Sequence, residues 1–444
     1  MKYIKEVKEI EAKFIFLLSI LWIGYSFLFD KYSYSIGIIF SVLYIVIFIN
    51  INLQKKLYLI VFTLPFTSIF KISPSLPSIM IILYGIYIFD TIVIKKKSVY
   101  LIDVISIIGV IVFQIIGVSI YNGSIVAIMS FSLNIIFMRL CILNLKGIKD
   151  SKKSEVLLTV SLVFGISMIL SIILADIFPR IPYIVLPEKQ SLLMSINRFN
   201  GLNGDPNYYS QLVLVSISLL LAAINLKISN KLKIIMIIMT IFLIISGYRS
   251  ISKSYALTSI ILLILFFIYL VKKIIKVKTA YKNILLLIIV AFISLISLYF
   301  LIGYIVIPLI KSRTDSGDFL TGRGDIWVKY IEMIKMDPLV ILNGAGFSNS
   351  GNVLFKFFGY SKSPHNVYIE ILVEIGIVGI TFILIILRDI IWKFKLIINS
   401  ELCIYIMMFA VTSLGLSLSS NDAIFILLPL CVLIDNNKKK LNNL

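Results

Sequence analysis

Charged side chains are scarce in this sequence. Asp, Glu, Lys and Arg make up 14% of the 444 residues, whereas hydrophobic types make up 60% and the mean hydropathy is +1.04. Soluble domains carry about 25% charged residues, because their surface must face water. The composition therefore excludes a soluble globular protein, and its high apolar content also excludes an intrinsically disordered chain. It predicts a protein that crosses a membrane many times, since about 20 apolar residues span a bilayer as a helix.

Residues that bind metals or form disulfides are also few. The sequence has three cysteines, Cys141, Cys403 and Cys431, which all lie inside apolar runs, and a single histidine. Such cysteines are typical of small buried residues, so we expect neither a disulfide framework nor a zinc site. The sequence contains no P-loop and no recognisable Ser-His-Asp pattern. We therefore expect no cofactor and no bound metal ion.

Long apolar runs are what the sequence has in abundance. In a membrane such runs form helices, because lipid offers no partner to unpaired backbone groups and barrel strands are shorter. The predicted fold class is an all-α polytopic membrane protein with about 12–14 transmembrane helices. The apolar segments lie at about 14–29, 34–51, 57–70, 78–94, 100–120, 124–145, 155–177, 208–226, 232–247, 255–271, 283–310, 366–387, 402–418 and 421–435.

Positive charge exceeds negative charge by 20, from 42 Lys and Arg against 22 Asp and Glu. Lysine and arginine collect in the cytoplasmic loops of membrane proteins, so topology explains this excess and no nucleic-acid partner is expected. When the N-terminus is placed in the cytoplasm and the spans alternate, every loop on the cytoplasmic side is basic. The pattern predicts a multi-pass protein with both termini in the cytoplasm.

Two outer segments, at about 178–207 and 311–365, are too long to be ordinary connections. Within the second, Asp325–Met336 carries a helical apolar stripe that Pro338 ends, which predicts a short helix near the outer membrane face. The chain then divides into an N-terminal transmembrane bundle at 1–177, transmembrane helices with the first outer loop at 178–310, the long outer loop at 311–365, and C-terminal transmembrane helices with a short basic cytoplasmic tail at 366–444.

Arginine is distributed differently from lysine. Five of the seven arginines fall in outer loops, where topology does not favour positive charge. The planar guanidinium group binds two phosphate oxygens at once, so an outer arginine cluster indicates an anionic substrate such as a diphosphate. The alternative is that these side chains reach lipid headgroups. The five are Arg180, Arg198, Arg249, Arg313 and Arg323.

The single histidine, His365, ends the long outer loop beside Pro364 and begins an apolar helix. A histidine there could take a proton from a sugar hydroxyl or bind a phosphate oxygen. Glu370, about one helical turn further on, could orient the imidazole, although Glu374 lies on the same face. Either carboxylate could instead serve helix packing, but carboxylates inside membranes are costly and are therefore candidates for function.

The segment Asn200–Asn207 is rich in turn-forming residues. Asp205 or Asn207 is placed to cap the following apolar helix, which ordinary turn chemistry explains. The glycines of Asn343-Gly344-Ala345-Gly346 could let a ligand approach the backbone. Beside the arginines and His365, we include Asn207 among the candidate substrate-binding residues.

Taken in order, these pieces make the chain resemble the O-antigen ligase/polymerase superfamily of bacterial envelope glycosyltransferases, including Wzy-type polysaccharide polymerases. The resemblance covers roughly 195–380, and Tyr248 stands where the family often has serine before arginine. The matching pieces are Arg198-Phe199-Asn200-Gly201, Asp205-Pro206-Asn207, Ser246-Gly247-Tyr248-Arg249-Ser250, Gly322-Arg323 with Trp327, Gly344-Ala345-Gly346, and His365-Asn366 with Gly376 and Gly379.

The resemblance implies a metal-independent glycosyl transfer on the outer face of a bacterial cytoplasmic membrane. The donor is a glycan on a polyprenyl diphosphate, and an acceptor sugar hydroxyl displaces the diphosphate. The expected partners are this lipid-linked oligosaccharide, a glycan acceptor, membrane lipids, a chain-length regulator and a flippase. Carried over to this sequence, the catalytic candidates are Arg198, Arg249, Arg323 and His365, and the substrate-binding candidates are Asn207, Arg313, Asn366 and Glu370.

Three functions compete at this point. The first is a polymerase that joins repeat units into O-antigen or capsular polysaccharide. The second is a ligase that transfers the finished glycan to lipid A core or to protein. The third is a flippase or transporter for the same lipid-linked sugar, which would place charged residues near the middle of the bilayer, whereas most of the remaining charge here falls in outer loops.

Overall fold

The computed structural model of the chain describes residues 2–73, 78–185, 198–226, 228–262, 264, 303, 323–398, 400, 402–418 and 422–433. All regular secondary structure in these residues is helical, and no strand occurs among them, which confirms the all-α fold class. Several predictions lie outside the described residues: Arg313, nearly all of the span at 283–310, the second half of the span at 255–271, and the loop segments 186–197 and 311–322.

The helices of the first half follow the predicted apolar segments closely. The span predicted at 57–70 is a short helix that ends at Thr63 and continues into a 3-10 turn containing Pro65, because proline cannot continue the α-helical hydrogen bonds. The elements are α1 (Lys2–Tyr32), η1 (Ser33–Ile36), α2 (Gly37–Asn50), α3 (Leu53–Thr63), η2 (Leu64–Phe66), α4 (Met80–Phe89), η3 (Asp90–Ile94), α5 (Leu101–Tyr121), α6 (Ile125–Lys146), α7 (Asp150–Ile177) and α8 (Arg180–Val185).

The second half combines long spans with short helices. Residues 253–262 are also helical. The elements are α10 (Pro206–Ile224), α11 (Asn230–Tyr248), α15 (Arg323–Met336), α16 (Leu339–Asn343), α17 (Ser350–Phe358), α18 (Val367–Glu370), η5 (Ile371–Ile375), α19 (Gly376–Ile386), α20 (Arg388–Trp392), α21 (Phe394–Ile398), α22 (Leu402–Thr412), η6 (Ser413–Gly415), α23 (Asp422–Leu427) and η8 (Leu428–Leu433).

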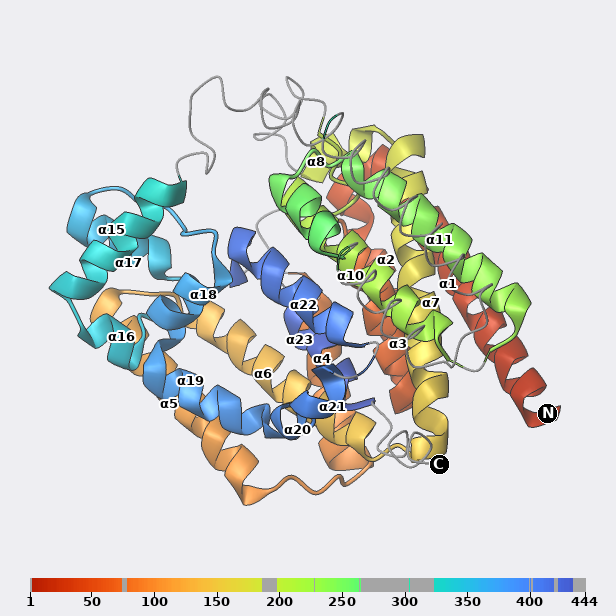
Figure 1. The fold of residues 1–444 in the computed structure, drawn as a ribbon, viewed down its shortest axis with the longest axis horizontal. Coiled ribbons are helices and arrows are strands. Elements are labelled where there is room, and N and C mark those ends of the chain that lie inside the picture. Colours follow the sequence, from red (N-terminus) through yellow and green to blue (C-terminus); the bar gives the residue numbers. More distant parts are fainter. Residues whose placement is uncertain are drawn as a thin grey trace, which may run out of the picture.

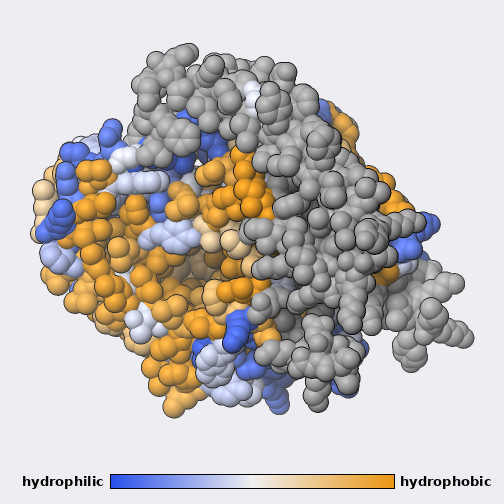
Figure 2. All heavy atoms as spheres, in the orientation of Figure 1, coloured by the Kyte–Doolittle hydropathy of each residue, from blue (hydrophilic) through white to orange (hydrophobic). Residues whose placement is uncertain are grey.

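The described surface is that of a multi-pass membrane protein. In Figure 2, hydrophobic residues cover most of the described face, and hydrophilic ones gather toward its upper left and lower edge. Many large apolar side chains point outward, as lipid requires and water does not favour. Seven described segments are long and apolar enough to cross a membrane: Ala12–Asn50, Leu101–Tyr121, Ile125–Lys146, Asp150–Ile177, Pro206–Ile224, Asn230–Tyr248 and Val367–Ile386.

Helix α10 lies at the centre of the bundle. It packs against α7, α11 and α22, and nearly every residue from Tyr209 to Ala223 is buried (Figure 1). On the other side of the bundle, α5 runs along α19, and α6 packs against α4 and η8. The N-terminal end of α10, which carries Asn207, is thereby held close to the C-terminal end of α22.

An aromatic cluster joins the N-terminal elements. The indole of Trp22 on α1 stacks on Phe66 of η2 at 4.4 Å between ring centroids, and Tyr25 stacks on Phe40 of α2 at 3.8 Å. Aromatic pairs of this kind add about 0.5–1.5 kcal/mol beyond the area they bury. These rings, from α1, α2 and η2, fix the first two spans against the turn that Pro65 creates.

Three short helices, α15, α16 and α17, form a cap beside one end of the spans, at the upper left of Figure 1. The predicted helix over Asp325–Met336 is confirmed as α15, which begins at Arg323, and its Ile326, Tyr330 and Met333 are buried against the cap. Trp327 and Tyr330 also hold the next segment: Trp327 Nε1 donates to Pro364 O at 2.9 Å, and Tyr330 OH donates to Lys362 O at 2.8 Å.

The span Val367–Ile386 is interrupted at Gly376, whose φ of +72° lies in a region that L-residues rarely adopt. The interruption frees backbone carbonyls, which must find partners inside the protein. Ala345 N donates to Val373 O at 2.7 Å, and Gly346 N donates to Glu374 O at 3.0 Å. The loop after α16 therefore inserts into the broken helix and ties the cap to the membrane bundle.

Candidate functional site

Arg198 is bound to the start of α10. Asp205 caps this helix by accepting hydrogen bonds from Asn207 N and Tyr208 N, so the cap predicted at Asp205 or Asn207 is Asp205. Asn207 Oδ1 instead accepts from Arg198 Nη2 at 3.3 Å, and Arg198 Nε donates to Ser250 O at 3.0 Å. The motif around Arg198 and the one around Arg249 are thus in direct contact, although about fifty residues separate them.

Arg249 has an acidic partner that the sequence did not reveal. Its two terminal nitrogens donate to both carboxylate oxygens of Asp176 at 2.8 and 2.6 Å, and its guanidinium lies 4.0 Å from the ring centroid of Phe199. The hydrogen bond to Asp176 raises the pKa of Arg249. Asp176 is an acid at the C-terminal end of an apolar span, and an acid at such a position is a signal that the sequence contains.

Arg323, the first residue of α15, reaches the turn that follows α22. Its Nη1 donates to Gly415 O at 3.2 Å. Burial lowers the pKa of Arg323, while the charges of Asp205 and Tyr208 oppose that effect, so both lie close to the guanidinium. Gly415 is also adjacent to Ser254.

A row of hydroxyl groups connects Arg323 to Arg198. Ser252 Oγ donates to Asn207 Oδ1 at 3.0 Å and lies 2.8 Å from Ser254 Oγ, which faces Gly415. Arg198 and Arg323 therefore meet the two ends of one short polar surface. The sequence predicts that these arginines act together, and the structure brings them together through side chains that no motif contained.

His365 is presented by a strained turn. Its φ of +47° is unusual for a residue with a side chain. Two carbonyls just before it are held by α15: Pro364 O accepts from Trp327, and Lys362 O accepts from Tyr330. The imidazole is exposed, and its Nδ1 lies 3.2 Å from Ser417 Oγ. Asn366, the next residue, caps α18 by accepting hydrogen bonds from Tyr368 N and Ile369 N.

A hydrogen-bonded chain joins His365 to Glu370. Ser417 Oγ lies 2.9 Å from Ser363 Oγ, which donates to Glu370 Oε1 at 2.6 Å, and Leu418 N donates to Glu370 Oε2. An ionised carboxylate can only accept, so the hydroxyl hydrogens point toward it along the chain. Nδ1 of His365 then donates to Ser417 Oγ. In the neutral imidazole the single ring proton is therefore on Nδ1, and Nε2 is free to accept a proton.

Glu374, the rival carboxylate, faces elsewhere. It accepts from Ser348 N at 2.9 Å and from Ser350 N at 3.3 Å, in the loop between α16 and α17. Glu370 and Glu374 are both buried and lie one turn apart, but only Glu370 reaches the chain that ends at His365.

The turn Ser413–Ser417 is where the site residues converge. Arg323 bonds to Gly415, His365 contacts Ser417, and Tyr208 both donates to Ser417 O at 2.8 Å and accepts from Ser417 N at 3.0 Å. Since Tyr208 follows Asn207, the partner of Arg198, this turn joins three separate motifs. The run Ser413-Leu414-Gly415-Leu416-Ser417, small and polar within an apolar segment, was the signal that sequence reasoning did not use.

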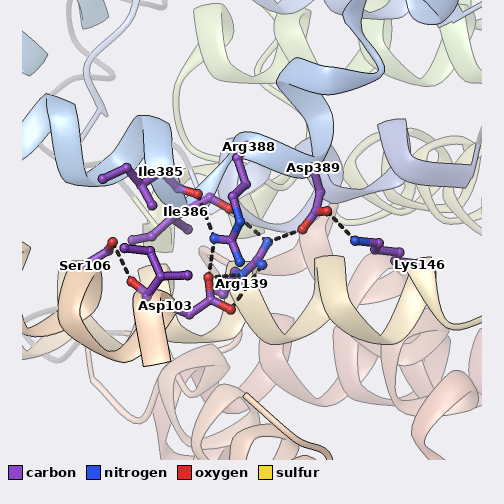
Figure 3. Close-up of polar contacts among 9 residues, drawn as sticks. Asp103, Ser106, Arg139, Lys146, Ile385, Ile386, Arg388 and Asp389 are labelled. Carbon is purple, nitrogen blue, oxygen red and sulfur yellow. Dashed lines mark hydrogen bonds and ion pairs between the residues drawn. The ribbon is translucent and has the colours of Figure 1, made fainter. Parts of the chain in front are cut away.

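The two arginines that fall outside the predicted outer loops, Arg139 and Arg388, belong to a different cluster, which Figure 3 shows. Arg139 is fully buried and donates to Asp389 Oδ2 at 2.6 Å and to Asp103 Oδ2 at 3.1 Å. Arg388 also donates to Asp103, and Lys146 pairs with Asp389 at 2.6 Å. Since Arg388 follows the far end of the span that begins after His365, this cluster lies away from the site.

Comparison with known protein families gives one match: residues 234–384 match the family described as O-antigen ligase. This part of the chain is therefore similar to an O-antigen ligase domain. The match confirms the resemblance to the O-antigen ligase/polymerase superfamily, whose members are membrane glycosyltransferases. No curated protein and no solved structure matches the chain.

The matched region extends from α11 to α19 and covers about a third of the chain. Arg249, Arg323 and His365 lie inside it, whereas Arg198 and the Ser413–Ser417 turn lie outside. The site is therefore completed by residues from both sides of the matched region, which the packing of α10 and α22 brings to it.

Proposed function

We propose that this protein polymerises polyprenyl-diphosphate-linked oligosaccharide repeat units into O-antigen or capsular polysaccharide on the outer face of the bacterial cytoplasmic membrane. One observation carries the proposal: Arg198, Arg323 and His365, from three motifs separated along the chain, meet around the Ser413–Ser417 turn. Two guanidinium groups beside an imidazole supply what the reaction needs, positive charge for a leaving diphosphate and a group that accepts a proton.

In the proposed reaction, the acceptor hydroxyl oxygen attacks the anomeric carbon of the donor sugar. A new carbon–oxygen bond forms as the bond from that carbon to the diphosphate breaks, and the diphosphate leaves with the electron pair. The proton of the hydroxyl passes to Nε2 of His365, which the hydrogen-bonded chain to Glu370 leaves unprotonated. Arg323 and Arg198 stabilise the charge that develops on the diphosphate, a role that needs no metal ion.

Arg249 has a second role in this proposal. Because Asp176 already binds both of its terminal nitrogens, Arg249 contributes less net charge than Arg323. Its backbone carbonyl accepts from Phe199 N at 2.9 Å, one residue after Arg198. We therefore assign two roles to Arg249: it positions the segment that carries Arg198, and it binds the leaving diphosphate.

The experiment uses the full chain in liposomes with a polyprenyl-diphosphate-linked repeat unit and no nucleotide sugar. Longer lipid-linked chains support the polymerase, and they exclude a flippase or transporter without transferase activity. Transfer to lipid A core or to protein without chain growth supports the ligase, which the description of the matched family favours.

Variants at the site test the assignment of residues. Arg323→Ala and His365→Ala are expected to lower turnover by about a hundredfold or more, since removing one group that stabilises transition-state charge costs that much. Lys335→Ala is the matched control, because Lys335 is an exposed cation on the same helix as Arg323. Full turnover in Arg323→Ala at an unchanged membrane level would show that the site lies elsewhere.

A further inference from the structure

A small polar cavity lies beneath the site, between η2, the loop before α10, α10 and α23. Its volume is about 30 Å³, close to the volume of one water molecule. Polar groups line it from each of these elements: Thr67, Asn203, Tyr208, Gln211 and Asp422. Nothing in the proposed reaction uses it.

Gln211 is fully buried, and its Oε1 has no hydrogen-bond partner among the described residues. The orientation of its amide follows from its neighbour. Thr412 Oγ1 donates its only hydrogen to Met408 O at 2.7 Å. Toward Gln211 it can therefore only accept, so the amide group 3.1 Å away must be the nitrogen Nε2. The oxygen of Gln211 is therefore the atom left without a partner, and Gln211 lines the cavity.

Each polar side chain at this cavity carries an oxygen atom that can accept a hydrogen bond. The Thr67 hydroxyl donates to Leu64 O at 3.2 Å, and Asn203 Oδ1 faces that hydroxyl at 3.4 Å. Asp422 adds a carboxylate to the cavity. Lys71 attracts this carboxylate electrostatically, although the two described residues form no direct ion pair. A water molecule donates only two hydrogens, whereas a cation satisfies every oxygen that faces it.

We propose that this cavity binds one sodium ion, held by the Asp422 carboxylate and by oxygen atoms of Gln211, Asn203 and Thr67. Hard oxygen donors suit such an ion, and a single carboxylate matches one positive charge better than two. The small volume favours sodium over larger monovalent ions. The ion joins α23 and η2 to α10 beside Tyr208, which holds Ser417 against His365. Sodium binding at this cavity is independent of the proposed glycosyl transfer.

The experiment measures sodium binding to the purified full chain without substrate. Saturable binding of ²²Na⁺ at one ion per chain is expected, with competition by lithium but not by choline. The thermal unfolding midpoint is expected to rise in sodium chloride relative to choline chloride at equal ionic strength. Asp422→Asn and Gln211→Leu are each expected to weaken ²²Na⁺ binding at least tenfold.

Two matched controls separate binding from folding. Asp90→Asn removes a buried carboxylate that already pairs with Lys56 at 3.0 Å, and Gln114→Leu removes a buried amide whose oxygen and nitrogen are both bonded. Both are expected to bind sodium as the unaltered chain does, even where they lower the unfolding midpoint. Absence of saturable ²²Na⁺ binding, or equal binding in Asp422→Asn and Gln211→Leu, would show that the cavity holds water only. Neither result depends on glycan elongation.

Discussion

The positive charge of arginine is compensated in three different ways in this protein. Arg139 is fully buried between Asp103 and Asp389, Arg249 is half-exposed and bound by Asp176, and Arg323 donates to a backbone carbonyl. Within the described residues no acid lies within ion-pair distance of Arg323. Its positive charge is therefore the least compensated of the three, which is why we assign it the closest contact with an anionic leaving group.

At the scale of single residues, Glu370→Gln is expected to lower kcat by about tenfold to a hundredfold. The amide no longer attracts the hydroxyl hydrogens of Ser363 and Ser417, so it no longer orients His365 or stabilises its protonated form. The acidic limb of the pH–rate profile should move to lower pH. Steady-state elongation measured across pH checks this.

Ser417→Ala should reproduce the effect, because it breaks the same chain one step from the imidazole. Glu374→Gln is the control, since its carboxylate binds the loop Ser348–Ser350 and should leave the pH profile in place. A profile that moves with Glu374→Gln and not with Glu370→Gln would contradict the assignment.

At the scale of elements, one interrupted helix links the candidate site to the buried charge cluster. The span Val367–Ile386 begins after His365 and is followed by Arg388 and Asp389, which join the buried charge cluster with α5 and α6. Its interruption at Gly376 is closed by the loop after α16. The position of His365 therefore depends on how this helix is held at its other end.

The cluster gives a stability prediction. Asp103→Asn is expected to lower the free energy of unfolding by about 3–5 kcal/mol, because it leaves fully buried Arg139 without one of its two carboxylate partners. Thermal unfolding in detergent checks this. Glu332→Gln, which loses only a solvent-exposed pair with Lys329, should change the midpoint little. Equal losses in the two variants would mean that burial does not set the strength of the cluster.

At the scale of the whole molecule, the charge pattern predicts which side of the membrane each end faces. The cap of α15–α17 should lie outside, and the connection between η3 and α5 should lie in the cytoplasm. The His365 site lies beside the cap, so its outer location follows from the same orientation.

Cysteine labelling tests this orientation. Lys356→Cys, on the exposed cap, should react with an impermeant maleimide in intact cells, and Lys96→Cys should react only after permeabilisation. Cys403 is replaced by alanine for this test, while Cys141 and Cys431 are buried and remain. The reverse labelling pattern would place the site in the cytoplasm and overturn the proposed donor.

The order of amino acids is enough to predict the membrane-spanning helical class, because apolar runs in lipid must satisfy their own backbone hydrogen bonds. It also predicted α15 from its apolar stripe, and it singled out Arg198, Arg323 and His365. The partners of these residues could be found only from the way the helices pack. Glu370 and Glu374 share a helical face, and the sequence gives no reason to choose between them. Packing of α22 brings Ser417 to His365 and Leu418 to Glu370, and these contacts distinguish Glu370 from Glu374. Such contacts between distant segments depend on how helices pack and not on local periodicity.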